Sequence, residues 1–242
     1  MKLLFLFLIV CVSIPVPAQK KISYKGLSEI SGEVLNSKIS HDIILASIGR
    51  YNGFKNRDSA LTDLDHWLNN YNPDSTYDEE KAQYKLLKKN YKEIKDILYY
   101  TSLVTSNLAY YNIPLLLGLT KNNPTLLYHS LVSKSIYNTL KMDSRERAKD
   151  QLNSIIYPSL KTFVSYLGQT DIKYFGVSVA YFSKDFANDK DYEIKVEALV
   201  LIAPIKTISD FINGKITDTD FLDLSDIYLL ERGGNFPVKI KL

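Results

Sequence analysis

The sequence is poor in cysteine, histidine, methionine and tryptophan, and its charges nearly balance. Its single cysteine is Cys11, so the part of the chain after residue 19 has none. That absence excludes intramolecular disulfides, thiolate nucleophiles and cysteine-ligated metals from this part. The formal net charge of +3 is too small to indicate a nucleic-acid partner or a membrane-surface partner.

The three histidines do not form a metal-binding motif. His41, His66 and His129 are far apart in the sequence, and neither an HExxH nor an HxH pattern occurs. We therefore expect no metal and no other cofactor, although the fold can still bring distant histidines together.

The longest uninterrupted apolar run lies at the N-terminus. Met1-Lys2 precedes the apolar stretch Leu3–Val16, and the small residue Ala18 follows it. A charged start, an apolar middle and a small-residue end are typical of a secretory signal peptide. The stretch is shorter than the roughly 20 residues that a membrane-spanning helix needs. We predict a signal peptide in residues 1–19, no membrane span, and a periplasmic or extracellular location; the alternative is a buried N-terminal strand.

The first half of the remaining chain predicts mainly helices. Asp58 is the expected start of an amphipathic helix that ends before Pro73. Thr76-Tyr77-Asp78-Glu79 is a capping-box pattern, and it predicts a longer helix that runs to Tyr111 with a break near Thr101.

Two more helices are predicted before the strands begin. Asn122-Asn123-Pro124 is the expected start of the first, whose inward residues are Leu127, Leu131, Ile136 and Leu140. Asp143 and Glu146 form a capping box for the second helix, which should kink or restart at Pro158 and end at Gly168.

The C-terminal third predicts a sheet of two antiparallel hairpins separated by a helix. The predicted segments are, in order, the strands Ile172–Phe186 and Tyr192–Ala203, the helix Pro204–Asn213, and the strands Asp226–Arg232 and Phe236–Leu242. Pro237 has no N–H to donate, so the last strand is expected at a sheet edge. The predicted fold is α+β: a largely helical region, residues 20–168, packed on a C-terminal antiparallel sheet of order β-β-α-β-β, residues 169–242. We expect one compact unit and a monomer.

Two motifs in this third suggest chemistry, but each has a structural explanation. Gly176-Val177-Ser178-Val179-Ala180 resembles the nucleophile elbow of serine hydrolases, which places its serine on a sharp turn between a strand and a helix. Here the serine lies within a predicted strand, and we interpret the small residues as room for a packed helix. The second motif suggests a calcium loop and contains Asp218, Asp220, Asp223 and Asp226. It lacks the glycine and the final glutamate of that loop, so a short acidic helix capped by Thr217 is favoured.

The predicted long helix carries a basic stripe, made of Lys81, Lys85, Lys88, Lys92 and Lys95. It is either a contact for an anionic partner or a solvated face. Acidic residues interrupt it, so we favour the solvated face.

The chain is rich in tyrosine, with 18 residues, and tyrosine can line a sugar- or peptide-binding groove. The candidate ligand-binding residues are Tyr84, Tyr91, Tyr99, Tyr100, Tyr110 and Tyr111. We expect an exported, non-enzymatic protein that binds an unidentified protein or glycan partner in the cell envelope. One alternative is an envelope hydrolase that uses carboxylates such as Asp218, Asp220 or Asp223. The other is an immunity or inhibitor protein that blocks a toxin.

Overall fold

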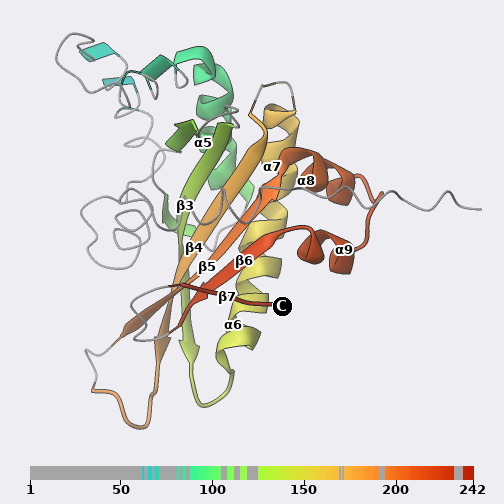
Figure 1. The fold of residues 1–242 in the computed structure, drawn as a ribbon. Helices are drawn as coiled ribbons and strands as arrows, with labels where there is room; N and C mark the ends of the chain where they lie inside the picture. The colour runs from blue at the N-terminus through green and yellow to red at the C-terminus, as the bar shows by residue number, and fades with distance from the viewer. Residues whose placement is uncertain are drawn as a thin grey trace, which may run out of the picture.

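The computed structural model has helices together with one mixed sheet, which confirms the α+β class (Figure 1). It describes residues 62, 65–66, 69–70, 81, 84–85, 88–104, 108–111, 115–118, 125–168, 170, 172–190, 194–231 and 237–242. The predicted signal peptide, His41 and the helix starts at Asp58 and Thr76 lie outside these residues. The described residues at 62–70 and 81–89 are helical, as predicted.

Seven described strands form the sheet, in the order β1-β3-β4-β5-β6-β7, with β2 pairing with β3 as well. The strands are β1 (Leu108–Tyr111), β2 (Leu115–Gly118), β3 (Thr125–Asn138), β4 (Tyr174–Lys184), β5 (Lys195–Pro204), β6 (Asp226–Leu230) and β7 (Val238–Lys239). Every pair is antiparallel except β3 with β4, which is parallel. A parallel pair needs a long crossover connection, and the helical run between residues 144 and 167 provides it.

The helix predicted between residues 122 and 140 is wrong, because this segment is strand β3. Leu127 and Leu131 are four positions apart, and this spacing puts them on one face of a strand as well as of a helix. β3 lies inside the sheet, and residues 126–133 are all buried. A strand covered on both faces shows no alternation of polar and apolar residues, so its pattern resembled that of a helix. Ile136 and Leu140, predicted inward, are 53% and 62% exposed.

The long helix also ends earlier than predicted. Helix α5 spans Tyr91–Val104, and a turn at Asn90 separates it from the helical residues before it. Residues 108–111, the predicted end of the helix, are strand β1, which pairs with β3. Hydrogen bonding to a neighbouring strand has outweighed the helical spacing of the sequence.

The prediction for the crossover helices is confirmed. Helix α6 (Ser144–Gln151) starts with a capping box of Asp143 and Glu146, and α7 (Tyr157–Leu167) ends at Gly168. Between them lies a π-helical segment, η2 (Leu152–Ile156). Pro158 has no N–H and its ring crowds the preceding turn, and the interruption falls directly before it.

The C-terminal strand order is confirmed too. β4 and β5 form one antiparallel hairpin and β6 and β7 pair in the same way, with β7 at the sheet edge. Between them lie two short helices, α8 (Ile205–Ile212) and α9 (Asp218–Asp223). Gly214 has a φ of +68°, a conformation that favours glycine after a helix. The sheet is not confined to this third, however, because β1, β2 and β3 precede residue 140.

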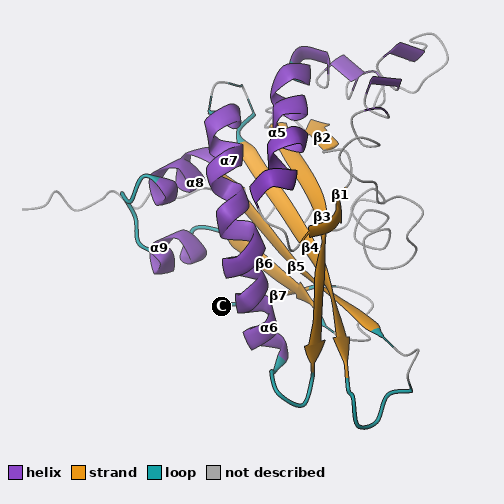
Figure 2. Cartoon of the chain, turned by 180° about the vertical axis from the view of Figure 1, so that it is seen from behind, coloured by secondary structure: helices purple, strands orange, loops and turns teal. Residues whose placement is uncertain are grey.

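The described helices gather on one face of the sheet (Figure 2). Strand residues Phe175, Val177, Val179 and Tyr181 form that face of β4, and they belong to the main core with residues of α5, α7 and α8. The opposite face forms a second buried cluster, and among the described residues it contains strand residues only. No helix in the described part of the chain is long and apolar enough to cross a membrane.

Gly176 faces the second cluster rather than a helix, which corrects our interpretation of the small residues in β4. A Cβ atom at Gly176 would lie 2.6 Å from Cδ2 of Tyr128, a ring on the neighbouring strand. Ser178 is buried in mid-strand, and its hydroxyl lies 3.3 Å from that of Ser130. A buried serine in a regular strand does not have the exposed position of a nucleophile elbow.

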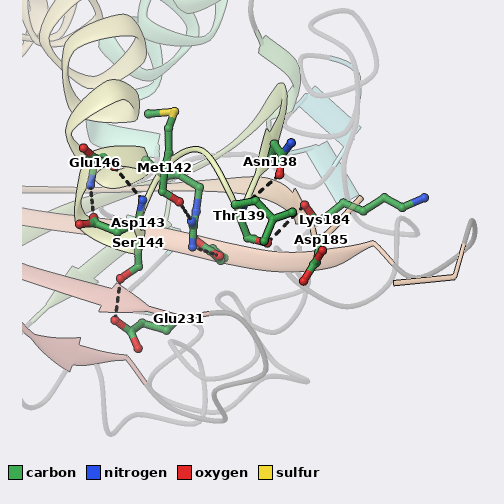
Figure 3. Close-up of polar contacts among 12 residues, drawn as sticks. Asn138, Thr139, Met142, Asp143, Ser144, Glu146, Lys184, Asp185 and Glu231 are labelled. Atoms are coloured by element: carbon green, nitrogen blue, oxygen red, sulfur yellow. Dashed lines mark hydrogen bonds and ion pairs between the residues drawn. The ribbon is translucent and has the colours of Figure 1, made fainter. Parts of the chain in front are cut away.

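Polar contacts hold the start of α6 against the sheet (Figure 3). Asp143 and Glu146 exchange hydrogen bonds of 2.9 and 2.8 Å between side chain and backbone, and Ser144 donates to Glu231 at 2.9 Å. The two bonds between Asp143 and Glu146 satisfy amide groups that the first turn of a helix leaves without partners.

Candidate functional site

A pocket between two helical segments contains two of the six candidate tyrosines. Asp65 and Asn69 line it from one segment, and Tyr84, Lys88 and Tyr91 line it from the other. The positions 84, 88 and 91 are spaced by four and three residues, which places their side chains on the same side of a helix. The pocket has a volume of about 320 Å³ and opens to the surface, at the lower end of the size range of ligand sites.

A chain of hydrogen bonds crosses from one wall of this pocket to the other. The Tyr91 hydroxyl donates to the Asp65 carboxylate, and the Lys95 ammonium donates to the Tyr91 hydroxyl at 3.1 Å. The Lys95 nitrogen also lies 3.8 Å from the Asp65 carboxylate. The hydrogen bond to Tyr91 raises the pKa of Lys95, and the charge of Asp65 adds to the shift. Lys95 therefore stays protonated, and it places a cation next to Tyr91 and Asp65, two residues of the pocket wall.

The two tyrosine rings are each contacted by a lysine of the predicted basic stripe. The Lys88 nitrogen lies 5.6 Å from the centre of the Tyr84 ring, and the Lys95 nitrogen lies 5.3 Å from the centre of the Tyr91 ring. Such contacts hold a cation over the face of an aromatic ring. Of the stripe lysines that the structure describes, Lys88 lines the pocket, and Lys85, Lys88 and Lys92 are exposed to solvent.

The described residues of the pocket offer several kinds of binding group. Asp65 is an acceptor, Lys88 is a donor, and Asn69 can be both. The two rings add apolar faces with a hydroxyl at the edge. This combination suits a ligand with many hydroxyl groups and flat apolar patches.

The other candidate tyrosines lie elsewhere. Tyr99 and Tyr100 are exposed on α5 and meet edge to face, with their ring centres 5.0 Å apart. Tyr100 also stacks on Tyr166 of α7 at 5.3 Å. Tyr110 and Tyr111 are in β1, and their side chains lie outside the described part. The four candidate tyrosines whose side chains are described therefore do not form one continuous site.

Sequence reasoning missed Asp65 and Asn69 as pocket residues. They are four positions apart on a helix, which is a signal for a shared face. Nothing in the sequence indicated that this face meets the one containing Tyr84 and Tyr91, since that depends on how the two helical segments pack. Lys88 was predicted as part of the stripe, but its position over a tyrosine ring was not.

The histidines play no shared role among the described residues. His66 is exposed, and its Nδ1 lies 3.0 Å from the side-chain nitrogen of Asn70. His129 is fully buried in β3, with its ring centre 5.8 Å from that of Phe163. Burial lowers the pKa of His129 to about 3, so its ring is neutral near neutral pH. In the described part of the chain, no three histidine, cysteine or acidic residues group as metal ligands would.

The C-terminal carboxylates have separate structural partners. Asp220 accepts from the Thr217 amide and hydroxyl in a capping box, which lowers its pKa. Asp218 accepts from the Tyr157 hydroxyl. Asp226 is buried at the start of β6 and pairs with Lys239. The predicted capping of this short acidic helix by Thr217 is confirmed.

The chain matches no family model, no curated protein and no solved structure in the comparisons with known proteins.

Proposed function

We propose that this chain is an exported, non-enzymatic protein that binds a glycan of the cell envelope in the pocket formed by Asp65, Asn69, Tyr84, Lys88 and Tyr91. One observation carries the proposal: two tyrosine rings, a carboxylate, an amide and an ammonium group converge on one open cleft. The export part rests on the signal-peptide pattern of residues 1–19.

A glycan fits the pocket better than an apolar ligand does. Sugar rings have apolar C–H faces that pack on aromatic rings, and hydroxyl edges that need donors and acceptors. Tyr84 and Tyr91 supply the faces, while Asp65 and Lys88 supply an acceptor and a donor. The Asp65 side chain is 44% exposed, so its carboxylate remains accessible to a ligand.

Titration calorimetry with neutral, amino and uronic-acid oligosaccharides tests this proposal. We expect Tyr84→Ala and Asp65→Asn to weaken binding at least tenfold, which is about 1.4 kcal/mol. Tyr99→Ala is the matched control, because Tyr99 is an exposed tyrosine outside the pocket. Its affinity should equal that of the unmodified chain.

Three results would contradict the proposal. One is the absence of oligosaccharide binding at millimolar concentration. Another is unchanged affinity in the Tyr84→Ala and Asp65→Asn variants. The third concerns export alone, and it is a measured mass that still includes residues 1–19 in the protein recovered from a secreting host.

A further inference from the structure

A second cleft lies between α7 and α8, on residues that are separate from the proposed glycan pocket. Asn153, Tyr157, Pro158 and Lys161 line one side, and Phe211 and Ile212 line the other. Its volume of about 440 Å³ is within the range of small-molecule sites. Both views of the fold show α7 and α8 side by side (Figures 1 and 2).

The apolar part of the cleft wall is built from packed aromatic rings. Tyr157 lies 5.1 Å from Phe211 between ring centres, and Phe211 stacks on Phe221 at 4.4 Å. Phe221 is fully buried, and the Tyr157 hydroxyl is held by Asp218 of α9. The rings are therefore fixed before a ligand arrives, which reduces the entropy cost of binding.

The rest of the cleft wall is polar and carries a positive charge. Lys161 is exposed and forms no ion pair with the described residues. Asn153 and Lys161 are eight positions apart, about two helical turns, so their side chains lie on the same side of the helical run. An ammonium group next to an apolar cleft favours a ligand with a carboxylate at one end and an apolar group at the other.

The π-helical turn adds an acceptor at the same place. The Tyr157 amide donates to the Leu152 carbonyl, five residues back. In this pattern the next amide would serve the carbonyl of Asn153, but that position is Pro158, which has no N–H. The Asn153 carbonyl therefore lacks this i+5 donor, and Asn153 is one of the residues that line the cleft. Single π turns inside α-helices occur frequently at functional sites.

We propose that this cleft binds a small N-acylated amino acid with an aromatic or branched apolar side chain. Its carboxylate pairs with Lys161, its side chain packs against Tyr157, Phe211 and Ile212, and its amide N–H donates to the Asn153 carbonyl. The ligand class follows from three features of the cleft: the cation of Lys161, the apolar surface, and Asn153, whose carbonyl lacks the amide donor that Pro158 cannot supply.

The test uses N-acetyl-L-phenylalanine as the probe, with the full chain in titration calorimetry. We expect Lys161→Gln and Asn153→Asp each to weaken binding at least tenfold. The aspartate of Asn153→Asp would place a negative charge beside the carboxylate of the probe. Both residues are exposed, so neither change should alter folding, and circular dichroism checks this. Lys149→Gln removes an exposed lysine of α6 outside the cleft, and it should bind as the unmodified chain does.

A second probe separates the role of charge from that of apolar packing. N-acetylphenylalanine amide has no carboxylate, so it should bind more weakly and be insensitive to Lys161→Gln. The proposal is overturned by no binding at millimolar concentration, by equal binding of the acid and the amide, or by unchanged affinity in both variants. Tyr84→Ala should leave this binding unaffected, so failure here is distinguishable from failure of the proposed glycan pocket.

Discussion

Replacing Glu197 by glutamine should destabilise the fold strongly, because it would leave a charged arginine without its partner in the core. The Glu197 carboxylate accepts from two nitrogens of Arg147, at 3.0 and 2.7 Å. Their side chains are 0% and 5% exposed, and a third nitrogen of Arg147 donates to the Met142 carbonyl. The pair joins α6 to β5, so it connects the helical layer with the middle of the sheet.

The expected magnitude follows from the burial of both charges. Removing one partner of a buried ion pair costs about 3–5 kcal/mol, since the remaining charge stays in a medium of low polarity. Tyr181 reports the same electrostatic environment: burial raises the pKa of its hydroxyl, and the charge of Glu197 raises it further. Removing both charges together is expected to cost far less, because hydrophobic replacements of buried pairs are often neutral or stabilising.

The measurement is urea denaturation followed by circular dichroism, on Glu197→Gln, Arg147→Met and the variant with Arg147→Met and Glu197→Leu together. Each single variant should lose about 3–5 kcal/mol of unfolding free energy, and the double variant should lose clearly less than either. A surface pair provides the control: Lys206→Ala should cost under 1 kcal/mol, because its nitrogen is largely exposed beside Asp210. Losses below 1 kcal/mol in both single variants, or additive losses in the double variant, would refute the reasoning.

Two further predictions concern the sheet. Gly176→Ala should lower the unfolding free energy by about 1–3 kcal/mol, because the new methyl group would meet the buried Tyr128 ring. In a Tyr128→Ala background the same change should cost much less, and equal costs in the two backgrounds would exclude that contact as the cause. The pKa of His129 is lowered in the fold to about 3 from 6.5, so the unfolded chain takes up a proton that the folded one does not. The titration of His129 therefore does not lower the free energy of unfolding above pH 6.5. As the pH falls from 6.5 toward 3, it lowers this free energy by up to about 1.4 kcal/mol per pH unit. His129→Leu should show a shallower decline in urea titrations between pH 6 and pH 4, whereas parallel curves would contradict the assignment.

The sequence was most informative where a local rule decided the structure. The capping box of Asp143 and Glu146 forms as predicted, and Thr217 caps its short acidic helix as predicted. The antiparallel hairpin predicted from residues 172–186 and 192–203 forms as β4 and β5. These features depend on neighbouring residues, so the sequence alone was enough to determine them.

Tertiary structure decided the features that depend on distant partners. Thr125–Asn138 is a strand because β1, β2 and β4 bond to its edges, and its apolar residues by themselves fitted a helix equally well. The candidate pocket also depends on distant partners, because Asp65 contacts Tyr91 only through the packing of two helical segments. Helix spacing fixes which side chains share a face, but it does not determine which other face they meet.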